Sequence, residues 1–335
     1  MELSLDQIEL RFAQPLATAY GRLHSRELVE VTLTGDDGLS GRGEAAPLEP
    51  YDGVSIARVL AALESYRSVL AAPLPAGVTA LDACRAVDEL PQALAAIDIA
   101  LWDLGGRRAG RPVCELLTSA PATSVAVNAS VAGEDPRQAA AAAAAAVAAG
   151  YSCVKLKVGL GDDEARVAAV REAIGPEPQL RLDANGAWSV AEAERLLSLL
   201  SRYGLELVEE PVSGLQATAE LRARVPVRIA IDETAASAGA LTARVADAVC
   251  LKISRCGGIG GLLAAASLVR STGAEVYLAS TYDGPRGIAA ALHAAAALAP
   301  LPPCGLATLE LFEGVAPLRV EHGEIAVPRS PGLGV

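Results

Sequence analysis

The sequence lacks an excess of positive charge, and this limits the partners that we expect. Its 335 residues include 28 Lys and Arg against 40 Asp and Glu, a formal net charge of −12 at pH 7. Nucleic acids and anionic membranes attract basic surfaces. We therefore expect neither as a partner and attribute the acidic charge to solubility.

Long apolar runs and a basic leader are also missing. No apolar run approaches the roughly 20 residues that span a bilayer, because Arg, Glu, Asp or Gly interrupts each alanine-rich stretch. The first residues, Met-Glu-Leu-Ser-Leu-Asp, contain no basic region before an apolar core, which a signal peptide requires. We expect a cytoplasmic protein.

Several common catalytic motifs are absent. Three histidines lie far apart at positions 24, 293 and 322, and there is no Gly-x-Ser-x-Gly elbow. Six cysteines are scattered without a Cys-x-x-Cys pair, which predicts reduced core residues. The glycine-rich stretch 257–261 lacks the Lys-Ser/Thr of a phosphate-binding loop, so we predict a turn between a strand and a helix.

What is present is a generous apolar content, 52% of the chain, with 20% charged residues. A chain of this length and composition is globular and forms one large barrel-type domain or two domains. Residues 1–118 predict an α+β domain. It begins with strands at 3–12, 27–34 and 39–46, and a turn at 35–38 joins the last two. Helical spacing then covers 55–71, 80–88 and a run after Pro91, which we expect Gly105-Gly106 to end.

From about residue 120 strands and helices alternate, which predicts a parallel barrel of the (β/α) type. The strands are expected near residues 124–130, 153–158, 180–184, 205–210, 227–232, 247–253, 275–280 and 304–309. The helices between them include 136–149, 162–173, 189–203 and 285–299. We assign 119–314 to the barrel. The tail predicts a strand pair, and residues 315–335 are expected to complete the first domain.

Two lysines lie on the same face of one predicted buried strand. Lys155 and Lys157 are two residues apart, and alternation along a strand points both side chains to the same face. Two buried ammonium groups repel each other unless carboxylates or an anion lie opposite.

Suitable carboxylates end the next three strands. They are Asp183, Glu209 and Asp232, and the strand after them carries Lys252. The C-terminal strand ends of such a barrel share one face. Three carboxylates there, without a nearby His or Cys, suit a hard cation such as Mg²⁺. A substrate held on that cation would have a lysine on each side.

This arrangement suits removal of a proton next to a carboxylate. The reaction places a second negative charge on the carboxylate, and a divalent cation and an ammonium group stabilise that enediolate. Lys155 and the metal would lower the pKa of Lys157 toward that of a base. In the purely structural alternative, the acids cap helices and the lysines form buried salt bridges.

These residues resemble the enolase superfamily over essentially the whole chain, in particular its muconate-lactonizing-enzyme subgroup. The resemblance implies a modified (β/α)7β TIM barrel with an N-terminal α+β capping domain. It implies that Asp183, Glu209 and Asp232 bind one Mg²⁺ per subunit, a role that Mn²⁺ is able to take over. It also implies Lys157 and Lys252 as the acid/base pair, although Lys252 could act as an electrostatic stabiliser alone. The mandelate-racemase subgroup needs a histidine after the seventh strand, where this chain has Ser280-Thr-Tyr-Asp283.

Within the subgroup, the stretches 127–130, 183–188 and 304–308 are similar to o-succinylbenzoate synthases of the menaquinone pathway. We therefore expect syn-dehydration of a small carboxylate substrate. Racemisation or epimerisation of an N-acyl amino acid or dipeptide is the alternative, although the Asp-x-Asp of dipeptide epimerases is missing from Gly305-Leu-Ala-Thr308. Muconate-type cycloisomerisation is the third candidate reaction. The hypothesis from a different functional class is a catalytically silent scaffold protein on the same fold.

Substrate specificity is expected in loops 16–27 and 48–54 of the capping domain and in residues at the strand ends. A homo-oligomer is also expected. The predicted substrate-binding residues are Tyr20, Tyr51, Asn185, Tyr282, Asp283 and Leu306.

Overall fold

A computed structural model describes residues 1–18, 21–133, 135–316 and 318–335. The chain begins with a three-stranded antiparallel sheet of β1 (Glu2–Thr18), β2 (Gly21–Thr34) and β3 (Ser40–Ala45), with β2 in the centre. The predicted turn at 35–38 joins β2 to β3, with Gly38 N donating to Gly35 O at 2.9 Å. Alternate residues of β2 are buried, including Val29, Val31 and Leu33. That apolar face packs against the helices that follow.

Five helices follow among the described residues: α1 (Glu49–Asp52), α2 (Ile56–Ala71), α3 (Ala80–Val87), α4 (Pro91–Ala109) and α5 (Val113–Leu117). Of these, α2, α3 and α4 agree with the predicted spacing except at one end, whereas α1, within the predicted loop 48–54, and α5 were not predicted. The prediction that Gly105-Gly106 ends the third long helix is wrong, because α4 continues to Ala109 and ends at Gly110, with φ 65°. A Cβ on Gly106 would lie 2.7 Å from the Cα of Gly332. Glycine here allows the C-terminal segment to cross the helix closely.

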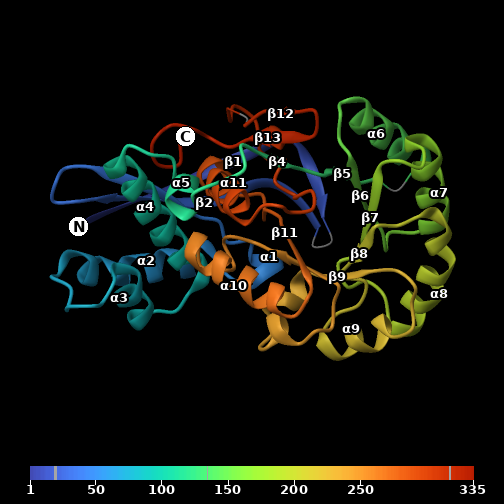
Figure 1. The fold of residues 1–335 in the computed structure, drawn as a ribbon, viewed down its shortest axis with the longest axis horizontal. Coiled ribbons are helices and arrows are strands. Elements are labelled where there is room, and N and C mark those ends of the chain that lie inside the picture. Colours follow the sequence, from blue (N-terminus) through green and yellow to red (C-terminus); the bar gives the residue numbers. More distant parts are fainter. Residues whose placement is uncertain (19–20, 134, 317) are drawn as a thin grey trace.

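The second part of the chain is a curled parallel sheet with helices on its outside (Figure 1). Neighbouring strands follow the chain in the order β5 (Ala129–Val131), β6 (Cys153–Lys157), β7 (Gln179–Asp183), β8 (Leu207–Glu209), β9 (Ile229–Ile231), β10 (Ala248–Leu251) and β11 (Glu275–Leu278). The connecting helices are α6 (Pro136–Ala148), α7 (Asp163–Ile174), α8 (Val190–Leu200), η1 (Ser201–Tyr203), α9 (Leu215–Arg222), α10 (Ile259–Ser271) and α11 (Pro285–Leu298). These elements confirm the capped, modified barrel.

The first and last predicted barrel strands differ in extent from the prediction. The strand expected at 124–130 is divided, because β4 (Ser124–Ala126) belongs to a different sheet from β5. The strand expected at 304–309 is reduced to two parallel bridges, Val127 to Cys304 and Ala279 to Gly305. Residues 304–305 thus lie between the first and seventh barrel positions. The chain then turns into a 3-10 helix, η4 (Leu309–Leu311).

The connection between β9 and β10 is built differently from its neighbours. Instead of an α-helix it contains two 3-10 turns, η2 (Glu233–Ala236) and η3 (Ala240–Thr242). Two short turns cover less of the barrel wall than a helix of three turns covers.

The predicted strand pair of the tail is confirmed as β12 (Val320–Glu321) and β13 (Glu324–Ala326). The second of these strands pairs with β4. The last residues reach the first part of the chain, where Leu333 N donates to Asp103 on α4 at 2.7 Å. The division at 118/119 and 314/315 remains a prediction. None of the helices in the described ranges combines the length and apolar character that a membrane span requires.

Candidate active site

The predicted site residues lie at one end of the barrel. Strand pairing places Lys157 beside Asp183, and Asp183 beside Glu209, at the same level of the sheet. Asp232 and Lys252 directly follow β9 and β10. A cavity of about 340 Å³ opens here between the strand ends and the first part of the chain.

Lys155 is held between two of the carboxylates. Its ammonium group lies 2.9 Å from Asp183 and 2.7 Å from Glu209. Burial alone would lower the pKa of Lys155, but Asp183 and Glu209 outweigh it and hold that pKa well above its usual value. Lys155 is therefore a permanent cation in this arrangement.

Lys252 is held in a similar way from the other side. It forms an ion pair with both carboxyl oxygens of Asp232, and its ammonium group lies 4.9 Å from the centre of the Tyr51 ring. The Tyr51 hydroxyl donates to Asp232 at 2.8 Å and accepts from Arg255 at 2.9 Å. Against the cost of burial, Asp232 raises the pKa of Lys252 well above its usual value.

Lys157 differs from both of these lysines. It lines the same cavity, and the described residues give its side chain neither a salt bridge nor a hydrogen bond. Burial lowers the pKa of Lys157, and the neighbouring Lys155 lowers it further, against the opposing effect of Asp183. Of the three lysines, Lys157 best fits the role of a general base.

Glu209 receives a second partner that the sequence analysis missed. The Tyr277 hydroxyl donates to Glu209 Oε2 at 2.7 Å, while Lys155 bonds Oε1. Burial, with Asp183 and Asp232 nearby, raises the pKa of Glu209 to about 7 despite Lys155. The only signal in the sequence was a tyrosine inside an otherwise apolar strand, since a buried Tyr hydroxyl usually has a partner.

Three residues that follow strands of the site adopt positive φ without being glycine, which is uncommon and is found more often at functional sites. They are Asn185, Glu210 and Tyr282, with φ of 45°, 41° and 58°. Glu210 is buried, and its carboxylate accepts from the backbone N–H of Asp232 at 2.7 Å. It therefore fixes the backbone that carries a predicted metal ligand, and it does not point to solvent.

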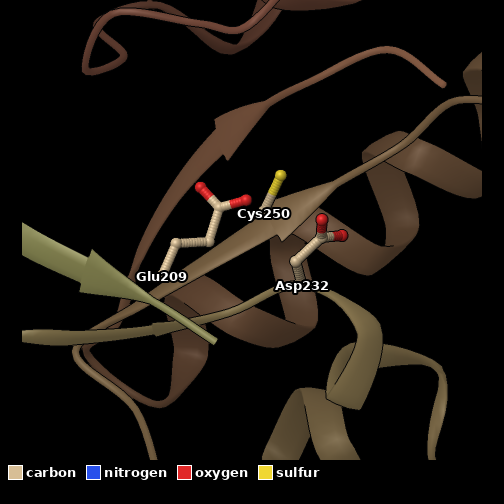
Figure 2. A group of neighbouring side chains, drawn as sticks. All are labelled: Glu209, Asp232 and Cys250. Atoms are coloured by element: carbon tan, nitrogen blue, oxygen red, sulfur yellow. The ribbon is translucent and has the colours of Figure 1, made fainter. Parts of the chain in front are cut away.

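The carboxylates fit a hard divalent cation. Figure 2 shows Glu209 and Asp232 with their carboxyl groups near the Cys250 thiol, and one ligand atom of each lies within 4.8 Å of the others. Burial raises the pKa of the Cys250 thiol well above its usual value, so sulfur remains protonated and is a poor ligand. Lys155 links Asp183 to Glu209. The remaining oxygen donors, from Asp183, Glu209 and Asp232, are the kind that Mg²⁺ prefers.

The predicted substrate-binding residues divide into three groups. Tyr51, Asn185 and Tyr282 line the cavity. Asp283 and Leu306 are buried, with 1% and 0% exposure, and do not belong to its walls, which are formed there by neighbours such as Thr308. Tyr20 lies outside the described residues.

The cavity walls contain few acids. Of its described lining residues, only Asp183 and Asp232 carry carboxylates, and both are predicted metal ligands. Near the eighth barrel position the wall consists of Gly305, Ala307 and Thr308. No carboxylate therefore remains, within the described walls, to pair with an ammonium group of a substrate.

The sequence matches two family descriptions. Residues 4–118 match the mandelate racemase/muconate lactonizing enzyme N-terminal domain, and residues 138–335 match the enolase C-terminal domain-like family.

Named relatives carry out different reactions. An o-succinylbenzoate synthase of Thermobifida fusca is 39% identical over 62% of this chain and 67% of its own length. The hydrophobic dipeptide epimerase of Enterococcus faecalis is 30% identical over 86% and 84%, and muconate cycloisomerase 1 of Rhodococcus opacus is 30% identical over 98% and 93%.

Solved structures show the same fold. A dipeptide epimerase from Enterococcus faecalis complexed with Mg and L-Leu-L-Tyr has a TM-score of 0.92 at 28% identity, over 99% of this chain and 98% of that one. An N-succinyl Arg/Lys racemase from Bacillus cereus has a TM-score of 0.93 at 26% identity, over 100% and 95%.

Proposed function

The chain belongs to the mandelate racemase/muconate lactonizing enzyme family of the enolase superfamily, and from this premise we propose that it is a Mg²⁺-dependent lyase that dehydrates a cyclic hydroxy carboxylate to o-succinylbenzoate. The observation that carries this choice is the acid-free wall of the cavity near the eighth barrel position, formed by Gly305, Ala307 and Thr308. A substrate whose remote end is uncharged or anionic fits that wall better than a dipeptide, whose ammonium group would be buried unpaired.

The three lysines have different roles in the proposed reaction: one transfers the proton and two stabilise negative charge. Lys157 takes the proton next to the substrate carboxylate and returns it to the departing hydroxyl group, so that water leaves from the same face. The ammonium groups of Lys155 and Lys252 remain protonated and stabilise the negative charge that develops between the two steps. Bound Mg²⁺, held by Asp183, Glu209 and Asp232, would supply further positive charge to the substrate carboxylate.

The test is turnover of the hydrated precursor of o-succinylbenzoate by purified, Mg²⁺-supplemented protein. We expect formation of the aromatic product, a loss of at least about a thousandfold in kcat for Lys157→Ala, and no product after chelation of divalent ions. Glu172→Gln, at an exposed position outside the site, is the control variant and should keep the activity of the unaltered protein. Failure of the unaltered protein to convert this precursor would reject the proposed reaction.

A second candidate is racemisation of an N-acyl amino acid. An acylated nitrogen carries no charge, so the acid-free wall accepts it too, and the fold resembles that of the N-succinyl Arg/Lys racemase. Racemisation needs proton exchange on both faces, by Lys157 and Lys252. It predicts incorporation of solvent deuterium from either enantiomer, whereas the dehydratase exchanges neither. A protein with no Mg²⁺-dependent exchange or turnover across a carboxylate library would be a silent scaffold. A homo-oligomer and a cytoplasmic location remain predictions.

A further inference from the structure

A second and larger cavity lies beside the catalytic one. Its volume is about 680 Å³, against about 340 Å³ for the catalytic cavity. The two cavities share Tyr51, Asp232 and Lys252 as walls. The Lys252–Asp232 ion pair and the Tyr51 ring therefore separate them.

The cavity exists because of the unusual connection between β9 and β10. Both 3-10 turns of that connection line the cavity, and the second of them, η3, also contacts α10. Ala264, Ala265 and Leu268 of α10 line the space, and Leu268 is 49% exposed. Residues of α1 and of the start of α4 also line the cavity. The result is a largely apolar space in which small residues leave room.

One polar group in this wall lacks a partner. Gln92 is 4% exposed and lines the cavity. Its side-chain NH₂ group donates a hydrogen bond to the Asp52 carboxylate at 2.8 Å. Only the NH₂ end of the amide is a donor, so this bond fixes the orientation of the amide and leaves the carbonyl oxygen at the other end. That oxygen is buried and has no hydrogen-bond partner within the described protein. Such an oxygen costs about 1–3 kcal/mol unless a ligand or water donates to it.

The guanidinium group of Arg255 supplies hydrogen-bond donors in the same cavity, where Gln92 supplies an acceptor. Arg255 lines the same cavity, and the one hydrogen bond that the described residues give its side chain goes from Nη1 to the Tyr51 hydroxyl. Arginine has five N–H donors, so the others are free to bind an acceptor. The charged lining residues balance, since Arg255 and Lys252 are matched by Asp52 and Asp232.

We propose that this cavity is a second small-molecule site, for an uncharged amide-type head group with an apolar tail. The N–H of the head donates to Gln92 Oε1, and its C=O accepts from Arg255. The tail packs on the alanines and Leu268 of α10. The proposal is independent of the reaction in the catalytic cavity, because neither Gln92 and Arg255 nor α10 has a part in that reaction.

Three probes of equal length test the chemistry of the head group. Hexanamide, hexanoate and hexylammonium are titrated into the full-length, Mg²⁺-loaded protein and followed by calorimetry or NMR. We expect saturable binding of hexanamide in the millimolar range, as is usual for a ligand of eight heavy atoms. A carboxylate is also expected to bind at the Mg²⁺ site, so the probes are compared by the part of their binding that the cavity-filling variant Ala264→Phe removes. That part should be at least tenfold weaker for the two charged probes. Equal or tighter binding of either charged probe, measured in this way, would overturn the assignment of a neutral ligand.

Variants locate the binding. Gln92→Leu removes the free oxygen, and Ala264→Phe fills the cavity from an exposed helix position that tolerates a larger side chain. Each should weaken hexanamide at least tenfold, with thermal unfolding confirming that the variants fold. Ala307→Phe, which fills the catalytic cavity instead, should leave the affinity unchanged. Absence of saturable hexanamide binding, or its loss in Ala307→Phe alone, would refute a separate site.

Discussion

Glu209 is held from two strands at once, by Lys155 on one carboxyl oxygen and by Tyr277 on the other. Tyr277 is 1% exposed, so Tyr277→Phe removes a hydroxyl without leaving space for water. We expect a loss of about 1–2 kcal/mol in the free energy of unfolding. We also expect about tenfold weaker Mg²⁺ binding, because groups that orient metal ligands typically contribute 10- to 100-fold in affinity.

Calorimetric titration of Mg²⁺ measures this effect without reference to activity. Tyr66→Phe is the matched control, since that hydroxyl is bonded to the carbonyl oxygen of Asp88 in the first part of the chain, away from the site. It should lower stability and leave Mg²⁺ affinity unchanged. Equal Mg²⁺ affinity in Tyr277→Phe and the unaltered protein would show that Tyr277 does not position Glu209 for the metal.

At the scale of elements, the turn between β10 and α10 is packed directly against α4. Gly258 precedes α10 with φ 100°, and a Cβ there would lie 2.4 Å from the Asp98 carboxylate and 2.6 Å from its Cβ. Gly273 follows α10 with φ 90° and has nothing within 4 Å of such a Cβ. Both alanine variants carry the conformational strain, and only Gly258→Ala adds a clash.

We therefore expect Gly258→Ala to lower the free energy of unfolding by about 1–3 kcal/mol more than Gly273→Ala does. Denaturant titration of the two variants measures the difference. Indistinguishable midpoints would mean that α4 and α10 are able to move apart at little cost.

At the scale of the whole molecule, a buried carboxyl group lies where the N-terminal sheet meets the barrel. Glu44 on β3 is 2% exposed and accepts from the backbone N–H of Gly284, before α11, at 2.6 Å. Burial, with Asp283 and Glu30 nearby, raises the pKa of Glu44 from 4.5 to about 8, against the opposing effect of Arg286.

Because this pKa is higher in the folded chain, the unfolded chain loses the proton first as pH rises. The contribution of Glu44 to stability therefore falls between pH 4.5 and about 8, by at most about 1.4 kcal/mol per pH unit. Glu44→Gln keeps the acceptor for Gly284 and should flatten the pH profile of the unfolding free energy over that range. An unaltered slope in the variant, with Glu172→Gln as the exposed control, would contradict the assignment.

The sequence predicted the barrel and the composition of its site for a local reason. Alternation along a strand puts Lys155 and Lys157 on one face, and consecutive parallel strands bring Asp183 and Glu209 to one edge. The end of α4 was wrongly predicted because Gly106 serves a contact with Gly332, more than 200 positions away in the chain. Local spacing carries no information about such a contact.

The sequence by itself therefore determined the family and the capped barrel, and it predicted the set of acids and lysines that the proposed chemistry needs. Only the tertiary structure decided how they are paired: Lys155 between two acids, Lys252 on Asp232 beside the Tyr51 ring, and Lys157 without an ion pair to any described residue. It also decided that a cavity lies behind Tyr51. Pairing and empty space depend on distances between segments that are remote in the chain, and those distances are set by packing of the whole molecule.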